Sequence, residues 1–154
     1  MLHAAVLAAL ITPPPTAPPQ VLPMPVPTGA ATAQIRNSGS TNTGGYTITV
    51  SSDGRTALEQ GAFPLRRRVA GRIVARFFAD LRAAGDVAKL PDAHCMKSVS
   101  FGTTTQVAYR GALSPDLSCP SHSALVRALY NDTQAIAQAA GVSMLPGPSK
   151  HFIP

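Results

Sequence analysis

The chain of 154 residues has no tryptophan, and aromatic residues make up only 5% of it. Proteins that hold single-stranded nucleic acid stack its bases on aromatic side chains placed among basic ones. That pattern is absent, so we expect no nucleic-acid partner. Acidic residues are also scarce, with 7 Asp and Glu against 13 Lys and Arg, a formal net charge of +6. This basic balance favours anionic neighbours.

Motifs that bind phosphate or a cofactor are absent too. The chain contains neither a Gly-x-Gly-x-x-Gly sequence nor a phosphate-binding loop, so we expect no cofactor. Lys97 stands next to Ser98 and three residues before Ser100. On a strand, these odd offsets direct the lysine and either serine to opposite faces, unlike the Ser-x-x-Lys turn of serine-lysine hydrolases. The sequence therefore favours a non-catalytic protein over an enzyme.

Charge is missing altogether from the start of the chain, since no formally charged side chain precedes Arg36. An apolar run at residues 2–11 is too short to span a bilayer but suits the apolar part of a signal peptide. It lacks the Lys or Arg that normally precedes such a run. Eight prolines follow between residues 13 and 27, which predicts an extended linker. We assign residues 1–33 to a signal-peptide-like segment and a proline-rich linker, and expect no transmembrane span.

Cysteine is scarce as well, because the chain holds only Cys95 and Cys119. An even number of cysteines behind an apolar first segment predicts one disulfide and an oxidising compartment. We therefore expect an exported protein, either periplasmic or extracellular. A disulfide that closes a loop of this length stabilises a small domain by about 3 kcal/mol through the lost freedom of the unfolded chain.

Alternating apolar and polar residues predict two β-hairpins. The first joins a strand at residues 46–50 to a more polar strand at 55–60. The second joins residues 98–101 to residues 104–109 across a turn at Gly102. Since the predicted disulfide encloses the second hairpin, it should hold the two ends of that hairpin together.

Apolar residues at helical spacing predict two amphipathic helices. The first ends near Gly85, and the second begins at Ser121 or Ser123 and ends at Gly141. The stretch 34–45 is rich in serine, asparagine, threonine and glycine, which is typical of a loop. The first helix carries an apolar stripe of Val69, Ile73, Phe77 and Leu81, and the second one of Leu125, Val126, Leu129 and Ile136.

The predicted order of elements is therefore ββα-ββα, which belongs to the α+β class. We expect a four-stranded antiparallel sheet with both helices packed on one face, and one disulfide. This domain is assigned to residues 34–141, and residues 142–154 are assigned to a flexible tail with three prolines.

Several of these features together resemble small exported bacterial α+β domains of unknown function. They are the strand at 46–50 that closes on Asp53-Gly54, the helix after it, the span from Cys95 to Cys119, and the last helix. The resemblance covers about residues 34–141 and implies the fold and an exported location. Because such domains have no assigned activity, it implies no functional residue.

Two histidines flank the predicted disulfide. His94 precedes Cys95 and His122 follows Cys119 by three residues, so the bridge should place both imidazoles in one neighbourhood. Asp92 and Asp116 fall in the loops nearby. Imidazole and carboxylate groups are the ligands of zinc and copper sites, so a metal held by His94 and His122 is one hypothesis.

A second hypothesis concerns the arginines of the first helix. Arg68, Arg72 and Arg76 recur at every fourth residue, and Arg66 and Arg67 precede them. They predict a basic helix face for an anionic partner, or simply a solvated face.

The sequence favours an exported, non-catalytic binding or inhibitor-like module. It would present the turn at 102–104, the loop at 114–118 or the arginine helix face to a protein or an anionic component of the cell envelope. One alternative is a metal-binding protein or hydrolase centred on His94 and His122. The other is a binder of anionic surfaces that uses the helix face from Arg66 to Arg76.

Overall fold

A computed structural model describes residues 31–60 and 64–142. The predicted leader and linker, except residues 31–33, and the predicted tail beyond Val142 lie outside this part. The elements, in chain order, are β1 (Thr32–Asn37), β2 (Tyr46–Ser51), β3 (Arg55–Glu59), β4 (Leu65–Arg68), α1 (Gly71–Ala84), the short 3-10 helix η1 (Val87–Lys89), β5 (Thr105–Tyr109), β6 (Ala112–Leu113) and α2 (Ala124–Ala140).

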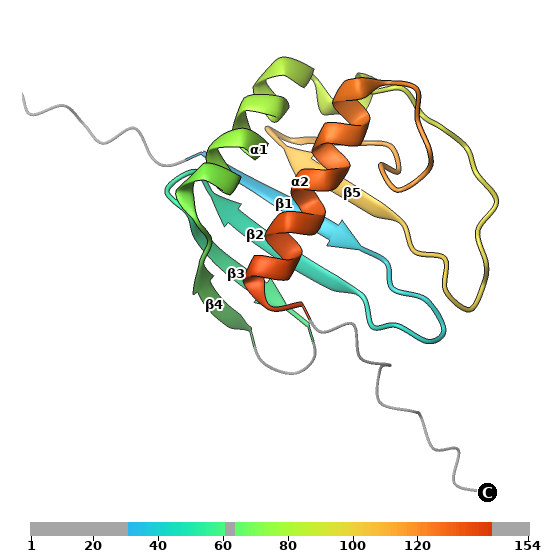
Figure 1. The fold of residues 1–154 in the computed structure, drawn as a ribbon, viewed down its shortest axis with the longest axis horizontal. Helices are drawn as coiled ribbons and strands as arrows, with labels where there is room; N and C mark the ends of the chain where they lie inside the picture. The colour runs from blue at the N-terminus through green and yellow to red at the C-terminus, as the bar shows by residue number, and fades with distance from the viewer. Residues whose placement is uncertain (1–30, 61–63, 143–154) are drawn as a thin grey trace, which may run out of the picture.

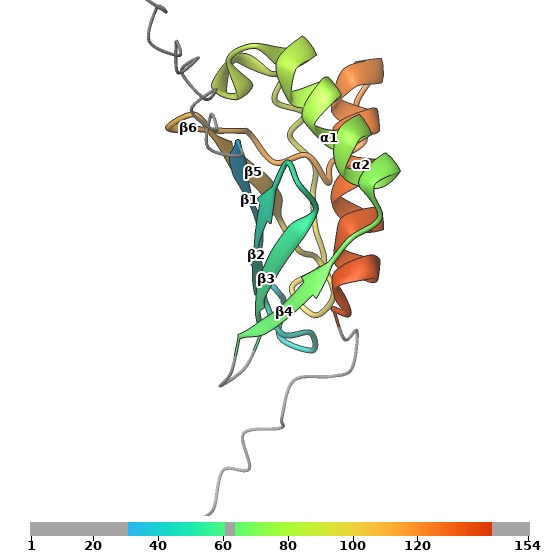
Figure 2. The same ribbon diagram turned by 90° about the vertical axis from the view of Figure 1, so that its left-hand side faces the viewer.

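The protein has two layers, a sheet and a pair of helices. All neighbouring strands are antiparallel, in the order β4-β3-β2-β1-β5-β6. Figure 2 shows the sheet from its edge with α1 and α2 on the same side. The predicted α+β class, antiparallel sheet and helix pair are confirmed. The predicted four strands in ββα-ββα order are wrong, because the sheet has six strands and four of them precede α1.

The strand β1, which the sequence did not predict, lies in the middle of the sheet between β2 and β5. The sequence assigned residues 34–45 to a loop and residues 32 and 33 to the linker. Ala33 and Ile35 are nevertheless buried, with Ile35 opposite Ile48 on one side and Val107 on the other. Two apolar residues before a serine- and glycine-rich stretch make a weak strand signal. The segment becomes a strand because it forms backbone hydrogen bonds with β2 on one side and β5 on the other.

The second predicted hairpin is also wrong in its first half. Residues 98–101 form no strand, and β5 pairs with β1 and β6 instead. Val99 and Phe101, which alternate as a strand would, are 84% and 71% exposed. The strand β1 pairs with the edge of β5 that the predicted hairpin would have used. The alternation of Val99 and Phe101 with serines therefore does not correspond to a strand with one buried face.

The strand β4 replaces what the sequence assigned to the beginning of the helix. Arg66 lies opposite Ala57, and Arg68 lies opposite Arg55, so this segment extends the first hairpin into a third strand. The helix α1 begins only at Gly71. Three consecutive arginines carry no strand periodicity, and the pairing with β3 decides the conformation.

Local signals at the ends of the elements are confirmed. The first hairpin forms between β2 and β3 as predicted. The hydroxyl of Ser123 accepts a hydrogen bond from the Val126 N–H at 3.4 Å, which caps the first turn of α2. The helix ends at Gly141, whose φ of 87° is left-handed and therefore suits glycine.

The core fills the space between the sheet and the helices. The apolar strand residues that face the helices are buried, and they belong to one cluster with apolar side chains from both helices. The sheet contributes Tyr46, Ile48, Val50, Val107 and Tyr109, and the helices contribute Phe77, Leu81, Leu129 and Ile136.

Neither helix in the described part of the chain is long and apolar enough to cross a membrane.

A substitution in β1 tests its central place. Ile35→Ala should lower the free energy of unfolding by about 2–5 kcal/mol, because it leaves a cavity between two strands and the helices. Arg36→Ala is the control on the same strand. Its guanidinium is exposed, so the expected loss is about 0.5 kcal/mol or less. Urea denaturation measures both, and an Ile35→Ala variant as stable as Arg36→Ala would contradict this placement of β1.

Candidate functional site

A long segment without helix or strand joins η1 to β5, and we call residues 91–104 the anchored loop (Figure 1). It carries the three most exposed large apolar side chains in residues 31–60 and 64–142. Met96 is fully exposed, Val99 is 84% exposed and Phe101 is 71% exposed, whereas the next are Leu113 at 42% and Leu65 at 39%. Apolar surface is thus concentrated on this loop.

The predicted disulfide is confirmed and holds the first half of the loop. Cys95 and Cys119 are bonded, with their Cα atoms 5.6 Å apart. Cys119 is buried just before α2. The bridge therefore ties the loop to the segment that leads into the last helix.

Lys97 makes a second anchor. Its ammonium group donates hydrogen bonds to the Thr103 carbonyl and the Ser118 hydroxyl, both at 2.6 Å, and forms an ion pair with the Asp116 carboxylate. The side chains of Lys97 and Asp116 are only 22% and 18% exposed. Because Thr103 belongs to the same loop, Lys97 closes the loop on itself and fastens it to the segment 114–118.

Asp116 is held as a carboxylate by its surroundings. Burial opposes its ionisation, but hydrogen bonds from Lys97, Ser118 and two backbone N–H groups outweigh burial and lower its pKa. The N–H groups are those of Thr105 and Ser118, each 3.0 Å from the same carboxylate oxygen. Asp116 thus connects the loop to the first residue of β5.

A tight turn forms the tip of the loop. The Gly102 N–H donates to the Ser98 carbonyl at 2.6 Å. A Cβ at residue 102 would lie 2.5 Å from that carbonyl oxygen and 2.5 Å from Cβ of Lys97, so only glycine fits. The sequence correctly predicted a turn near Gly102, but the turn lies within the loop and joins no strands.

The tip also rests on the connection between β1 and β2. The Ser40 hydroxyl and the Asn42 N–H both donate to the Ser100 carbonyl, at 2.8 and 3.3 Å. The Thr41 hydroxyl donates to the Val99 carbonyl at 3.2 Å. The backbone around the exposed side chains is therefore bonded to a second loop, while the side chains themselves remain free to make contacts.

A hollow of about 190 Å³ lies beside Phe101. Phe101 shares it with Tyr46, with Tyr130 and Gln134 of α2, and with Thr43 of the β1–β2 connection. Burial raises the pKa of Tyr46, and Tyr130 adds to the shift, so its hydroxyl stays protonated. An exposed aromatic ring thus stands next to a small recess with hydroxyl groups.

The contact between Lys97 and Ser118 was not found from the sequence, which compared Lys97 only with its neighbours Ser98 and Ser100. A lysine beside a serine can serve as a catalytic base only when its nitrogen has a free lone pair. Lys97 instead donates three hydrogen bonds, one of them to a carboxylate. The contact is therefore that of a charged lysine that holds a loop.

Both candidate metal ligands lie at the surface near the disulfide. The His94 side chain is 90% exposed, and its Nε2 is 3.7 Å from a carboxylate oxygen of Asp92. His122 is exposed, and its carbonyl accepts a hydrogen bond from Arg127. The described residues contain no group of three or more His, Cys, Asp and Glu side chains placed to hold a metal. A metal bound by His94 and His122 stays a prediction.

The arginines do not share a single helix face. Arg66 and Arg68 are on β4 and Arg72 and Arg76 are on α1, so the predicted continuous helix is wrong in its first part. Side chains alternate along a strand, and Arg67 lies against Gly141 at the end of α2. Binding of an anionic partner by Arg68, Arg72 and Arg76 stays a prediction, but their arrangement differs from the one expected.

Arg76 pairs with a residue of the other helix. The Arg76 guanidinium forms an ion pair with Asp132 of α2. The Asp132 side chain is almost completely buried. Burial raises the pKa of Asp132, the Arg76 guanidinium lowers it in part, and the neighbouring Asp80 raises it further. Arg76 is thereby committed to the contact between the helices.

Comparison with protein-family models, curated proteins and solved structures finds no significant match to this chain.

The ion pair at Asp116 predicts a pH dependence. Asp116→Asn should lower the free energy of unfolding by about 2 kcal/mol at neutral pH, since Lys97 loses a charged partner. The pKa of Asp116 is lower in the folded protein than in the unfolded chain. Its contribution is therefore complete above the ordinary aspartate pKa and is lost as the pH falls through the lowered pKa.

The difference between wild type and Asp116→Asn should accordingly shrink in acid. Urea denaturation at several pH values measures it. Asp92→Asn is the control, because the Asp92 carboxylate is 48% exposed and should contribute little. A loss from Asp116→Asn that stayed constant down to strongly acid pH would show that the charge of Asp116 is not the cause.

Removal of the disulfide should loosen the loop more than the sheet. Cys95→Ala/Cys119→Ala is expected to destabilise the protein by about 3 kcal/mol, which speeds hydrogen exchange in β2 through global unfolding, and to speed exchange at Thr103 and Thr104 further through local opening of the loop. Hydrogen exchange read by NMR gives both results. Equal acceleration in the loop and in β2 would mean that the bridge has no local role.

Proposed function

We propose that this protein is an exported, non-catalytic binding module of the inhibitor type, which contacts a protein partner through the anchored loop. One observation carries the proposal. Met96, Val99 and Phe101 are the most exposed of the large apolar side chains in the described part, and they lie on a loop that a disulfide and a largely buried ion pair hold in place. Exposed apolar groups gathered on one segment are typical of interaction surfaces.

The anchors reduce the cost of binding. A mobile loop loses conformational freedom when it is held by a partner, whereas a loop fixed beforehand loses little. Here Cys95 and Lys97 precede the exposed Val99 and Phe101, and Gly102 and Thr103 follow them, each in a contact described above. The arrangement favours a segment that is inserted into a partner in its existing shape.

The local surface also favours a specific contact. Aromatic side chains supply much of the binding energy at protein interfaces, usually at the centre of the buried area. Phe101 can enter an apolar pocket of the partner, while the adjoining hollow beside Tyr130 can receive a side chain in return. A partner with an apolar pocket next to a projecting side chain would fit this surface.

The proposed location follows from the disulfide. Cysteine pairs persist in oxidising compartments, so the bond between Cys95 and Cys119 supports a periplasmic or extracellular protein. Binding without catalysis is supported by the use of Lys97, the nearest candidate base to Ser118, as an anchor.

The proposal predicts the effect of polar substitutions at the tip. Val99→Ser/Phe101→Ser should reduce retention of the partner from an envelope extract at least about tenfold, because two anchors are lost. Leu113→Ser, at another exposed apolar position, is the matched control. Mass spectrometry of the proteins retained on each immobilised variant measures the effect, and thermal unfolding verifies that all variants are folded.

Retention by the wild type should also persist in high salt, since apolar contacts are not screened. A set of retained proteins identical for the wild type and Val99→Ser/Phe101→Ser would rule out the loop as the binding surface.

A further inference from the structure

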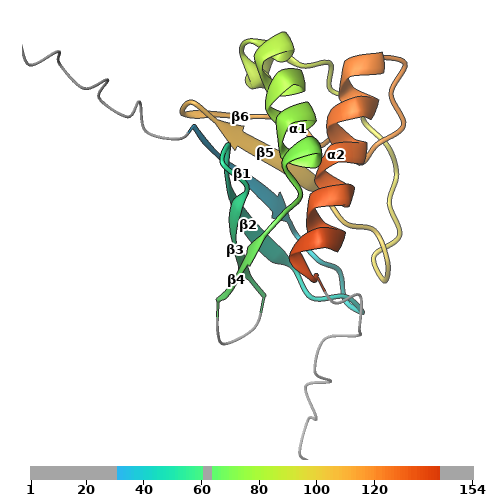
Figure 3. The ribbon, with the colours of Figure 1, turned by 60° about the vertical axis from the view of Figure 1, so that its left-hand side comes forward.

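The strand β4 forms one open edge of the sheet (Figure 3). It is the first strand in the order β4-β3-β2-β1-β5-β6, so within residues 31–60 and 64–142 only β3 pairs with it. All four of its residues are exposed. A strand edge of this kind presents backbone N–H and C=O groups that can pair with another extended chain.

The backbone groups of Arg66 and Arg68 face the open edge. In an antiparallel pair, bonded residues alternate along each strand with residues whose N–H and C=O point away from the partner strand. The Val69 N–H donates to the Gly54 carbonyl at 2.9 Å, and the Arg67 carbonyl accepts a hydrogen bond from a threonine hydroxyl of β3 at 3.1 Å. Residues 67 and 69 are therefore turned toward β3. Arg66 and Arg68, at the alternate positions, are turned away from β3 and can bond a further strand.

The same edge carries a surplus of positive charge. Arg68 lies directly opposite Arg55 in β3, and Arg66 is two residues earlier on the same face. This face points away from the helices, since Leu58, at an alternate position of β3, belongs to the core. Asp53 forms an ion pair with Arg55 at 2.8 Å, and its carbonyl accepts a hydrogen bond from Arg68 at 3.2 Å. In the part of the chain that the structure describes, no hydrogen bond or ion pair engages the Arg66 guanidinium.

This charge selects the strand that can be added. Like charges in facing positions destabilise a sheet, so a second copy of β4 paired at this edge would bring arginines against Arg66 and Arg68. The sequences of residues 1–30, 61–63 and 143–154 contain no Asp or Glu, so none of them offers the opposite charge. A strand with carboxylates at the facing positions would instead be attracted.

We infer that β4 accepts an acidic, extended segment of a partner protein as an additional strand of the sheet. Its acidic residues would recur at every second position and face Arg66 and Arg68, while the intervening residues would lie on the helix side, where Leu65 is 39% exposed. The backbone hydrogen bonds supply affinity, and the alternating acidic and apolar side chains supply specificity.

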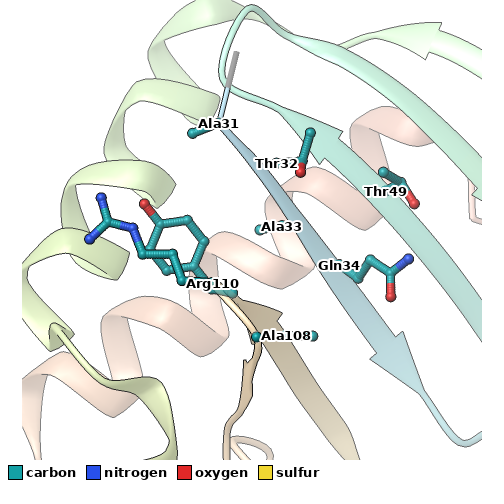
Figure 4. Close-up of a pocket in the computed structure, with 9 residues that line it drawn as sticks. Ala31, Thr32, Ala33, Gln34, Thr49, Ala108 and Arg110 are labelled. Carbon is teal, nitrogen blue, oxygen red and sulfur yellow. The ribbon is translucent and has the colours of Figure 1, made fainter. Parts of the chain in front are cut away.

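The opposite edge of the sheet is less suited to such a partner. The edge strand β6 has only two residues. Arg110 precedes it, and its guanidinium lies over the Tyr109 ring, 5.1 Å from the ring centre. Figure 4 shows the Arg110 side chain directed away from Gln34 and Thr49, which belong to the neighbouring strands β1 and β2. β4 thus offers both the longer edge and the unpaired charge.

The test titrates the full-length protein at low salt with a peptide of about eight residues that alternates glutamate and valine and is blocked at both ends. NMR should show slower hydrogen exchange at the Arg66 and Arg68 amides, and little change at Arg67, whose backbone faces β3. Arg66→Gln/Arg68→Gln should bind at least about fivefold more weakly, because two cross-strand pairs of opposite charge are lost. Arg36→Gln/Arg82→Gln removes the same charge from exposed positions of β1 and α1 and should bind like the wild type.

Methylated peptides separate strand addition from simple charge attraction. N-methylation of every glutamate removes the N–H groups along one edge of the extended peptide, and N-methylation of every valine removes those along the other. The charge is the same in both. Because a strand bonded to β4 uses one edge only, one methylated peptide should lose at least about tenfold in affinity, and the other should bind like the unmodified peptide.

Slower exchange at Arg66 and Arg68, with loss of affinity in one methylated peptide, supports the inference. It is overturned if the wild type does not bind the peptide, if both methylated peptides bind alike, or if the two double variants bind alike. It is also overturned if the two amides are already protected without peptide, since another strand would then occupy the edge. β4 and the anchored loop share no residue, so failure here leaves the proposed contact through the loop unaffected.

Discussion

The pairing of β1 with both β2 and β5 is the constraint on which the rest of the structure depends. β1 joins the meander of β2, β3 and β4 to the pair of β5 and β6, so without it the sheet would divide into two pieces. Ile35 is buried between Ile48 and Val107, and this row of apolar side chains lies beneath the helices. One strand near the beginning of the described residues thus determines the width of the sheet and the surface on which α1 and α2 pack.

The position of β1 also explains the anchored loop. Because β5 is flanked by β1 and β6, the segment before β5 cannot form a hairpin with it. It therefore runs as a loop, and Val99 and Phe101 face solvent instead of a partner strand. An irregular segment of this length needs other contacts to be ordered, and the disulfide and the Lys97–Asp116 ion pair supply them. The position of β1 beside β5 thus accounts both for the strand order of the sheet and for the exposure of the loop.

The anchored loop and the outer face of the sheet differ in chemistry because they arise differently. The anchored loop exposes apolar groups that no strand or helix covers, which favours an apolar partner. The outer face of the antiparallel sheet differs, because every second residue there points away from the core and is polar or small. Thr49 and Arg66 belong to that outer face, whereas Ile48 and Leu58 belong to the core. Each surface is thus suited to a different kind of ligand.

The sequence by itself determined the features whose causes are local. The helical spacing of apolar residues, the caps at Ser123 and Gly141 and the alternation at β2 each depend on a few neighbouring residues. The disulfide could be predicted because two cysteines allow only one pairing. Only the tertiary structure decided which segments pair at long range, because β1 and β4 become strands through their neighbours and not through their own composition. The grouping of Lys97 with Asp116 and Ser118, and the open edge at β4, follow from that pairing and could not be read from spacing along the chain.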